Sequence, residues 1–353
     1  MSDATTPPAV HTQASAVLDV QNLAVRFDTH QGTVRAVRDV SYRLAPGETL
    51  GIVGESGSGK SVTSLAVMGL IPSPPGVIES GRVLFEGQDL LQLRSRQMRK
   101  IRGGALSMIF QDPMTSLNPL LTVGKQLMEV LANHEGLRGR RARARCAAGL
   151  GEVGIPNPEA RLDAYPHELS GGMRQRVMIA MGLLCNPRVL IADEPTTALD
   201  VTIQAQILEL MKTLQREHGT AIVLITHDLG VVAGMSDRVQ VMYAGRVVEK
   251  ADVDPLFQRP LHPYTRGLLN SVPTLDGSPH ERLQSIDGQP PDLADLPAGC
   301  AFAPRCGWKE AQCTDDEPGL DPVAGSADGR VSACFRAAAF ANGSAPAPEE
   351  VRP

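Results

Sequence analysis

The sequence predicts an α/β fold with a central parallel sheet, and three observations support this. A short apolar run at residues 50–53 leads into a glycine-rich loop and then a helical stretch at 61–71. Two further apolar runs, at 188–193 and 221–226, are rich in β-branched residues, as strands buried on both faces usually are. Residues 202–219, between these runs, have helical periodicity. Alternation of strand, loop and helix is typical of a layered α/β core.

The remaining elements follow from local patterns. Alternating apolar residues predict half-buried strands at 17–27 and 33–44, and Pro46-Gly47 predicts a turn before the strand at 50–53. Residues from about 112 to 166 look mainly helical, so we expect a helical insertion in the α/β core. After about residue 254 the chain becomes rich in proline and carries scattered cysteines, which marks a smaller C-terminal appendage.

The composition indicates an ordinary globular protein and disfavours several functions. Of 353 residues, 42% are hydrophobic and 21% are charged. The net charge of −5 argues against a broad nucleic-acid footprint. The basic run at 138–145 is either a solvated helical face or a contact with a partner or anionic lipid. No secretion signal or membrane-length apolar run is visible, so we expect a cytoplasmic protein without disulfides.

The glycine-rich loop matches the phosphate-binding pattern G-x-x-x-x-G-K-[ST] between a predicted strand and a predicted helix. The glycines let backbone N–H groups approach phosphate oxygens closely. Lys60 would carry charge to the β- and γ-phosphates, and the Ser61 hydroxyl would ligate Mg²⁺. The sequence thus predicts a nucleotide site formed by Gly54, Glu55, Ser56, Gly57, Ser58, Gly59, Lys60 and Ser61.

Polar residues also follow the other apolar runs. Asp193, at the tip of its predicted strand, would be a second Mg²⁺ ligand, and the adjacent Glu194 would orient or deprotonate an attacking water. His227, at the tip of the next strand, would contact the γ-phosphate. Gln111 would reach the Mg²⁺ or the water through its amide oxygen.

A second anion-binding feature occurs in ELSGGMRQR, residues 168–176. Ser170, Gly171 and Gly172 precede a predicted helix, whose unpaired N–H groups and dipole favour an anion. One nucleotide site does not require two such features.

The chain resembles the ATP-binding cassette (ABC) family over about residues 18–254. The resemblance is carried by six motifs, GESGSGKS, FQDP, LSGGMRQR, VLIADEP, TTALD and THD. In this family two cassettes pack head to tail. The resemblance therefore implies that Ser170, Gly171 and Gly172 serve ATP held by a partner, and that Asp200 communicates across the interface. Phe27 fits the aromatic residue that stacks on adenine. The implied fold is a P-loop NTPase of ABC type, with a helical subdomain, an antiparallel β subdomain and a small cysteine-bearing appendage.

Four segments narrow the resemblance to ATP-binding subunits of bacterial dipeptide/oligopeptide permeases. They are FQDPMTSLNP, DEPTTALDVTIQAQILEL, RPLHPYTRGLLNSVP and GCAFAPRCGWKEAQC. Such a subunit would lie on the cytoplasmic face of the membrane. Its partners would be a homologous second ATP-binding subunit, two membrane permeases and, through them, an extracytoplasmic peptide-binding protein. Alternatives are transport of nickel or another small solute, or a soluble cassette ATPase acting on nucleic acid or ribosomes.

The expected organisation has four parts. A disordered leader covers 1–16, and the ATPase domain covers 17–254 with its helical subdomain at about 112–170. The permease-family extension covers 255–336, and a disordered tail covers 337–353.

Four cysteines in the extension have the spacing C-x5-C-x6-C-x20-C, which suits a metal site. The spacing favours an iron–sulfur cluster over zinc, and unmetallated thiols are the other alternative. The resemblance to the permease subunits implies a [4Fe–4S] cluster on Cys300, Cys306, Cys313 and Cys334.

Overall fold

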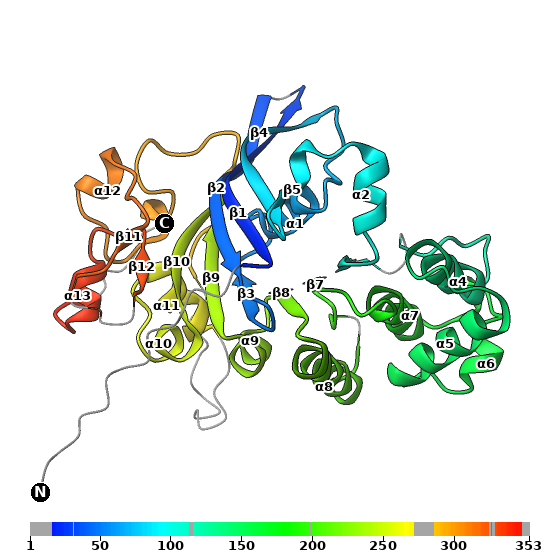
Figure 1. Ribbon diagram of the computed structural model, residues 1–353. Coiled ribbons are helices and arrows are strands. Elements are labelled where there is room, and N and C mark those ends of the chain that lie inside the picture. Colours follow the sequence, from blue (N-terminus) through cyan, green and yellow to red (C-terminus); the bar gives the residue numbers. More distant parts are fainter. Residues whose placement is uncertain are drawn as a thin grey trace, which may run out of the picture.

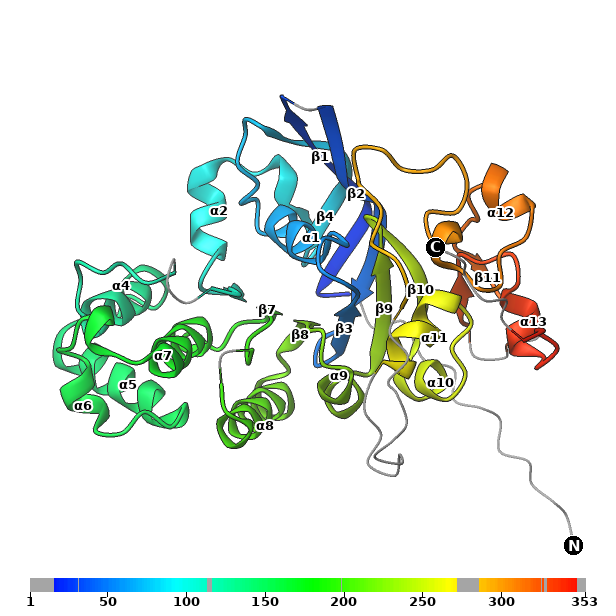
Figure 2. The ribbon, with the colours of Figure 1, turned by 180° about the vertical axis from the view of Figure 1, so that it is seen from behind.

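The computed structural model describes residues 16–30, 32–112, 116–197, 199–271, 286–324, 326 and 329–347. Most of the expected leader and the end of the expected tail lie outside these ranges. Figure 1 shows three regions side by side: a central pair of sheets, a group of helices on one flank and the C-terminal extension on the other. Figure 2 shows the same arrangement from behind.

The N-terminal part forms a four-stranded antiparallel sheet in the order β2-β1-β4-β5. Both strands expected from the alternating pattern are present here. They are the long strands β1 and β2, in which most apolar side chains are buried and polar side chains take the more exposed positions between them. The strands are β1 (Leu18–Thr29), β2 (Gly32–Leu44), β4 (Gly76–Phe85) and β5 (Gln88–Asp89).

The main sheet has eight strands in the order β11-β12-β10-β9-β3-β8-β7-β6. From β9 to β6 every neighbouring pair is parallel, as the apolar runs predicted. The strands are β3 (Thr49–Val53), β6 (Leu106–Ile109), β7 (Val189–Asp193), β8 (Ala221–Ile225), β9 (Arg238–Tyr243), β10 (Arg246–Asp252), β11 (Asp321–Pro322) and β12 (Val331–Ser332).

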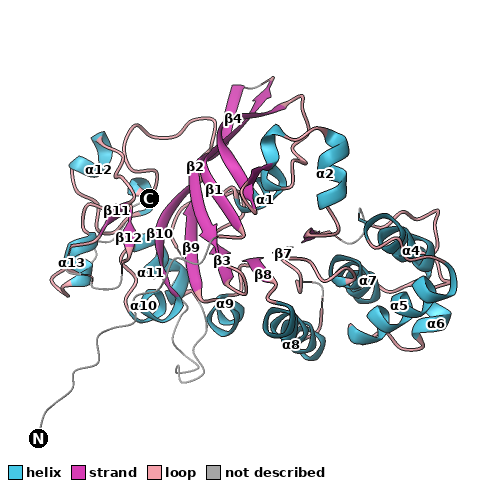
Figure 3. Ribbon diagram, viewed as in Figure 1, coloured by secondary structure: helices cyan, strands magenta, loops and turns pink. Residues whose placement is uncertain are grey.

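Helices cover the sheets and form the flank, as Figure 3 shows by colour. Helix α1 stops at Val67, before the end of the stretch predicted at 61–71, because Gly69 adopts a left-handed conformation with φ +59°. The helices of this part are α1 (Lys60–Val67), α2 (Ser95–Ile101), α4 (Val123–His134), α5 (Gly139–Glu152), α6 (Pro158–Arg161), α7 (Gly171–Leu183), α8 (Val201–His218) and α9 (Leu229–Met235), with 3₁₀ turns η1 (Leu90–Gln92) and η2 (Pro166–Glu168).

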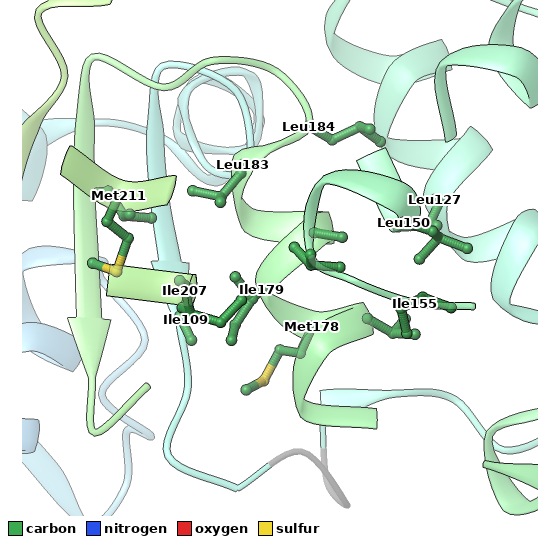
Figure 4. Packing of buried hydrophobic residues seen from close by; sticks show 14 of the residues in the cluster. Ile109, Leu127, Leu150, Ile155, Met178, Ile179, Leu183, Leu184, Ile207 and Met211 are labelled. Carbon is green, nitrogen blue, oxygen red and sulfur yellow. The ribbon is translucent and has the colours of Figure 1, made fainter. Parts of the chain in front are cut away.

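Helix α7 joins the helical group to the main sheet through an apolar cluster. Ile179 on α7 packs with Ile109 at the end of β6 and Ile207 on α8, and all three are almost fully buried (Figure 4). On its other side α7 meets the helical group, where Leu127 and Leu150 are fully buried. Because this cluster fixes α7 against the sheet, it also fixes the turn at the start of α7.

The C-terminal extension continues the main sheet. Its strand β12 pairs with β10, and β11 pairs with β12. The expected disordered tail from residue 337 is wrong over its first part: residues 337–341 are helical, because Phe340 is buried and stacks edge-on against Trp308. The elements are α10 (Val253–Gln258), α11 (Pro263–Asn270), η3 (Ala303–Arg305), α12 (Gln312–Asp315) and α13 (Ala337–Ala341).

None of the helices in the described ranges has both the length and the apolar character that a membrane span requires.

A buried polar junction attaches the extension to β10. Glu249 is fully buried, accepts hydrogen bonds from the backbone N–H groups of Leu261 and His262, and pairs with Arg330 at 3.1 Å. The imidazole of His262 is also buried, and its Nδ1 accepts a hydrogen bond from the Tyr264 N–H at 3.0 Å. Burial lowers the pKa of His262 to about 3, so the ring stays neutral in the folded chain.

This junction predicts a specific dependence of stability on pH. Between pH 6.5 and 3 the unfolded chain binds a proton at His262 that the folded chain does not, so the free energy of unfolding falls as the pH drops. From pH 7 to 5 the loss from this residue is about 2 kcal/mol. In His262→Asn, which keeps a side-chain acceptor, we expect a correspondingly smaller loss in urea denaturation at the two pH values. His218→Asn, at an exposed position, is the matched control. Equal losses in His262→Asn and the unsubstituted chain would contradict the assignment.

Candidate functional site

The phosphate-binding loop connects the end of β3 to the start of α1. Its two outer glycines are required by geometry, because Gly54 has φ +152° and Gly59 has φ +100°. A Cβ atom at Gly54 would lie 2.2 Å from the Met242 carbonyl oxygen, and one at Gly59 would lie 2.4 Å from the Ala36 carbonyl oxygen. The loop therefore keeps this conformation only with glycine at both positions.

Lys60, the first residue of α1, directs its ammonium into the loop. Nζ donates hydrogen bonds to the carbonyl oxygens of Gly54 at 2.7 Å and Glu55 at 2.9 Å. Burial lowers the pKa of Lys60, while the carboxylates of Glu194, Asp193 and Glu55 oppose that shift. The site thus holds a positive charge among three negative ones.

Asp193 ends β7 beside the loop and fits a divalent cation. It is buried, and its Oδ1 has no hydrogen-bond partner. The Ser61 side chain hydrogen-bonds to this carboxyl group and lowers its pKa, but burial, the larger effect, raises it. A hard cation at this point would satisfy the buried oxygen and favour the ionised form. Two of the expected Mg²⁺ ligands, Ser61 and Asp193, therefore lie side by side.

The other polar residues expected at this edge lie around the carboxylate of Glu194. The amide nitrogen of Gln111 donates to its Oε2 at 3.1 Å, and Nδ1 of His227 lies 3.4 Å from its Oε1. Thr197, which the sequence analysis missed, donates its hydroxyl to Oε2 at 3.1 Å. Glu194 has a left-handed backbone with φ +48°, and strain of this kind is concentrated at functional sites.

The turn before α7 lies outside this cluster. Ser170 caps the helix by accepting the Met173 N–H at 3.3 Å. Gly171 is exposed and lacks a positive φ, and a Cβ placed there would meet nothing within 4 Å. Neither the backbone nor the packing of this chain therefore requires glycine at 171, which favours close approach by a group from outside the chain.

The structure places two other expected residues without assigning their roles. Asp200 caps α8 by accepting the Ile203 N–H at 3.0 Å. Phe27 is half-buried in β1, opposite Val34 of β2 and Gly76 of β4. Interface communication by Asp200 and adenine stacking by Phe27 stay predictions.

The sequence analysis also missed a contact between the extension and the loop. The Glu55 N–H donates to the Tyr264 hydroxyl at 2.7 Å, and Arg305 donates to both oxygens of the Glu55 carboxylate at 2.7 and 3.0 Å. No local sequence pattern marks Tyr264 or Arg305 as a partner of the loop.

The four cysteines of the extension line one cavity, together with Phe302 and Trp308 among other residues. Burial raises the pKa of Cys306 to about 11 and that of Cys334 to about 12. No group of three or more His, Cys, Asp or Glu side chains in the described ranges is arranged to hold a metal ion. The four thiols therefore line the same cavity, but they are not arranged as the ligands of a metal ion.

Comparisons with known proteins agree with this geometry. Residues 37–197 match the family model described as ABC transporter, and residues 248–313 match that of the oligopeptide/dipeptide transporter C-terminal region. The oligopeptide transport ATP-binding protein OppD of Bacillus subtilis is 56% identical over 88% of this chain and 87% of its own length. The dipeptide transport ATP-binding protein DppD of the same organism is 57% identical over 86% of this chain and 90% of its own length.

A dimeric ATP-binding cassette bound to ADP and Pi, in a post-hydrolysis state, superposes with a TM-score of 0.61 at 28% identity. The match covers 67% of this chain and 98% of that one, so the superposed part is a complete cassette. With relatives more than half identical along most of their length, the chain belongs to the ABC transporter ATP-binding protein family, in the group that carries the oligopeptide/dipeptide transporter C-terminal region.

Proposed function

We propose that the chain is the ATP-hydrolysing subunit that energises import of di- and oligopeptides through a membrane ABC transporter. The observation that carries the proposal is the meeting of Lys60, Asp193 and Glu194 at one edge of the main sheet. The extension, shared with relatives named for oligopeptide and dipeptide transport, supports peptides as the cargo. The alternatives of a small inorganic solute or of nucleic acid are not favoured by these relatives.

The chemistry assigned to this edge is ATP hydrolysis. Lys60 and the amides of residues 56–61 bind the triphosphate and stabilise negative charge on the transferring phosphoryl group. Ser61, Asp193 and Gln111 would hold Mg²⁺, which would neutralise part of the negative charge of the triphosphate. Glu194 orients the attacking water and accepts its proton, and His227, whose Nδ1 lies 3.4 Å from Glu194 Oε1, would contact the γ-phosphate.

A second cassette would complete the site. Ser170, Gly171 and Gly172 would present the N-terminus of α7 to the γ-phosphate bound by a homologous partner subunit. Val201, next to Asp200 at the start of α8, supports an interface there because its side chain is 83% exposed. ATP would close the two cassettes, and hydrolysis would reopen them.

The membrane partners would be two permease subunits, docked at the cytoplasmic face on the segment after Gln111 and on the helical subdomain. Leu120, 83% exposed, lies in this part of the chain and supports a protein contact there. The permeases would convert closure of the cassettes into alternating access, while an extracytoplasmic binding protein delivers the peptide. This chain would then make no contact with its cargo.

For the cysteine cavity we propose a [4Fe–4S] cluster on Cys300, Cys306, Cys313 and Cys334. Their lining of one cavity supports the proposal, and binding would require some movement of the thiols because they form no metal-binding group as they lie. Zinc is the less favoured occupant. The cluster would fix the fold of the extension or respond to oxidation, and it would take no part in hydrolysis.

Replacing Glu194 tests the hydrolytic assignment. In Glu194→Gln, carried in the assembled transporter, we expect ATP binding to persist and steady-state hydrolysis to fall at least about 100-fold, because the water loses its base. As isolated cassettes with MgATP, this variant should also trap the closed pair, which size-exclusion chromatography would detect as a dimer. Glu209→Gln, on the exposed surface of α8, should hydrolyse ATP normally. Near-normal hydrolysis in Glu194→Gln would remove Glu194 from this role.

Replacing Lys60 tests the binding assignment. Lys60→Ala should weaken ATP binding about 10- to 100-fold in equilibrium titration, because it loses charge-assisted hydrogen bonds worth ~1.5–3 kcal/mol. Lys125→Ala, at an exposed position on α4, controls for the loss of a positive charge. Equal affinities in the two variants would contradict the loop assignment.

Metal content tests the cysteine proposal. Protein purified without oxygen should contain about four iron and four sulfide per chain and absorb broadly near ~400 nm if the cluster is present. Replacing all four cavity cysteines with serine should abolish both signals, whereas replacing Cys146 and Cys185 should abolish neither. Iron-free protein carrying zinc would support the zinc alternative, and metal-free protein would refute both.

A further inference from the structure

We propose that Tyr264 and Arg305, here called the extension clamp, are positioning residues for the phosphate-binding loop, so that the C-terminal extension sets the affinity for ATP. The inference rests on the proposed ATP site. It assigns to the extension a part in nucleotide binding, in addition to any part in holding the fold together.

The first support is that every polar group of Glu55 is engaged. Its N–H donates to the Tyr264 hydroxyl, and its carbonyl oxygen accepts from Lys60 Nζ at 2.9 Å. Its carboxylate accepts two hydrogen bonds from the fork of Arg305, the strongest geometry for such a pair. Tyr264 and Arg305 both belong to the extension. Glu55 contacts these two residues and Lys60, so it connects the extension directly to Lys60.

The second support is that the clamp is itself rigid. Arg305 has a side chain only 4% exposed, and its guanidinium makes five hydrogen bonds. Besides the two to Glu55, these go to the carbonyl oxygens of Asp287 and Ile286 and to the Tyr243 hydroxyl. A guanidinium has five N–H groups, so its donors are used up.

Aromatic packing fixes Tyr264. It is fully buried, and its ring lies 4.5 Å from that of Tyr243 and 5.5 Å from that of Phe302, measured between centroids. Tyr243 ends β9, which pairs with β3 directly before the loop. The clamp is therefore attached to the same sheet that carries the loop.

Charge gives the clamp a consequence for binding. Glu55 is itself a residue of the loop and contacts Lys60, and its carboxylate opposes the lowering of the Lys60 pKa by burial, so this charge lies close to where phosphates would bind. An unpaired carboxylate there would repel a triphosphate. The paired guanidinium of Arg305 offsets this charge and fixes the position of the carboxylate.

Measuring the Kd of the full-length chain for MgATP, together with its Tm, tests the clamp. In Arg305→Met, which keeps an unbranched side chain but lacks the charge, we expect binding at least about fivefold weaker. The double variant Glu55→Gln with Arg305→Met should bind MgATP at least about twofold more tightly than Arg305→Met, because no unpaired carboxylate remains.

Arg330→Met is the matched control, because Arg330 is an equally buried arginine of the extension that pairs with Glu249, away from the loop. It should lower the Tm without changing the Kd. Tyr264→Phe keeps the ring packing and loses only the hydroxyl acceptor, so it tests the clamp even if Arg305→Met does not fold. We expect it to bind MgATP about threefold more weakly.

Two results would overturn the inference. One is an unchanged Kd in both Arg305→Met and Tyr264→Phe, whatever the Tm. The other is an affinity of the double variant no better than that of Arg305→Met. Failure of the unsubstituted chain to bind MgATP at all would instead refute the proposed function, so the two failures are distinguishable.

Discussion

The parallel register of β3, β8 and β7 is the constraint on which the site depends. Because parallel strands end at the same edge, the loop after β3, the carboxylates at the end of β7 and His227 after β8 must meet there. The apolar cluster around Ile179 then holds α7 against this sheet. Gln175 on α7 adds a buried hydrogen bond to the Pro195 carbonyl oxygen at 2.7 Å, just after Glu194. This hydrogen bond connects α7 directly to the segment that follows Glu194.

The extension is built into the same framework and is not a separate domain on a flexible tether. It adds β12 and β11 to the main sheet, buries the Glu249–Arg330 pair and contacts Glu55 directly. A buried ion pair stabilises little by itself, since desolvation of the charges offsets their attraction. Separating the two charges would leave each one buried without a partner, which costs free energy. The pair therefore favours one orientation of the extension on the sheet.

The sequence predicted those parts of the structure that depend on local patterns. Apolar runs identified β3, β7 and β8, and the glycine spacing identified the loop, because few other residues tolerate the backbone at Gly54 and Gly59. Short motifs also identified Gln111, Glu194 and His227 before the structure brought them together. The contact of Arg305 with Glu55 joins positions 250 residues apart and has no local pattern. The helix at 337–341 was missed although its alanines favour a helix, because so short a helix also needs the burial of Phe340, which no local pattern shows.

We propose that the triphosphate held at this edge is completed by the glycine turn of another cassette. The most direct test is a structure of the assembled pair of cassettes with Mg²⁺ and a non-hydrolysable ATP analogue. The account predicts that residues 170–172 of one cassette lie within hydrogen-bonding distance of the γ-phosphate bound at Lys60 of its partner. A structure in which that turn contacts no γ-phosphate would contradict it.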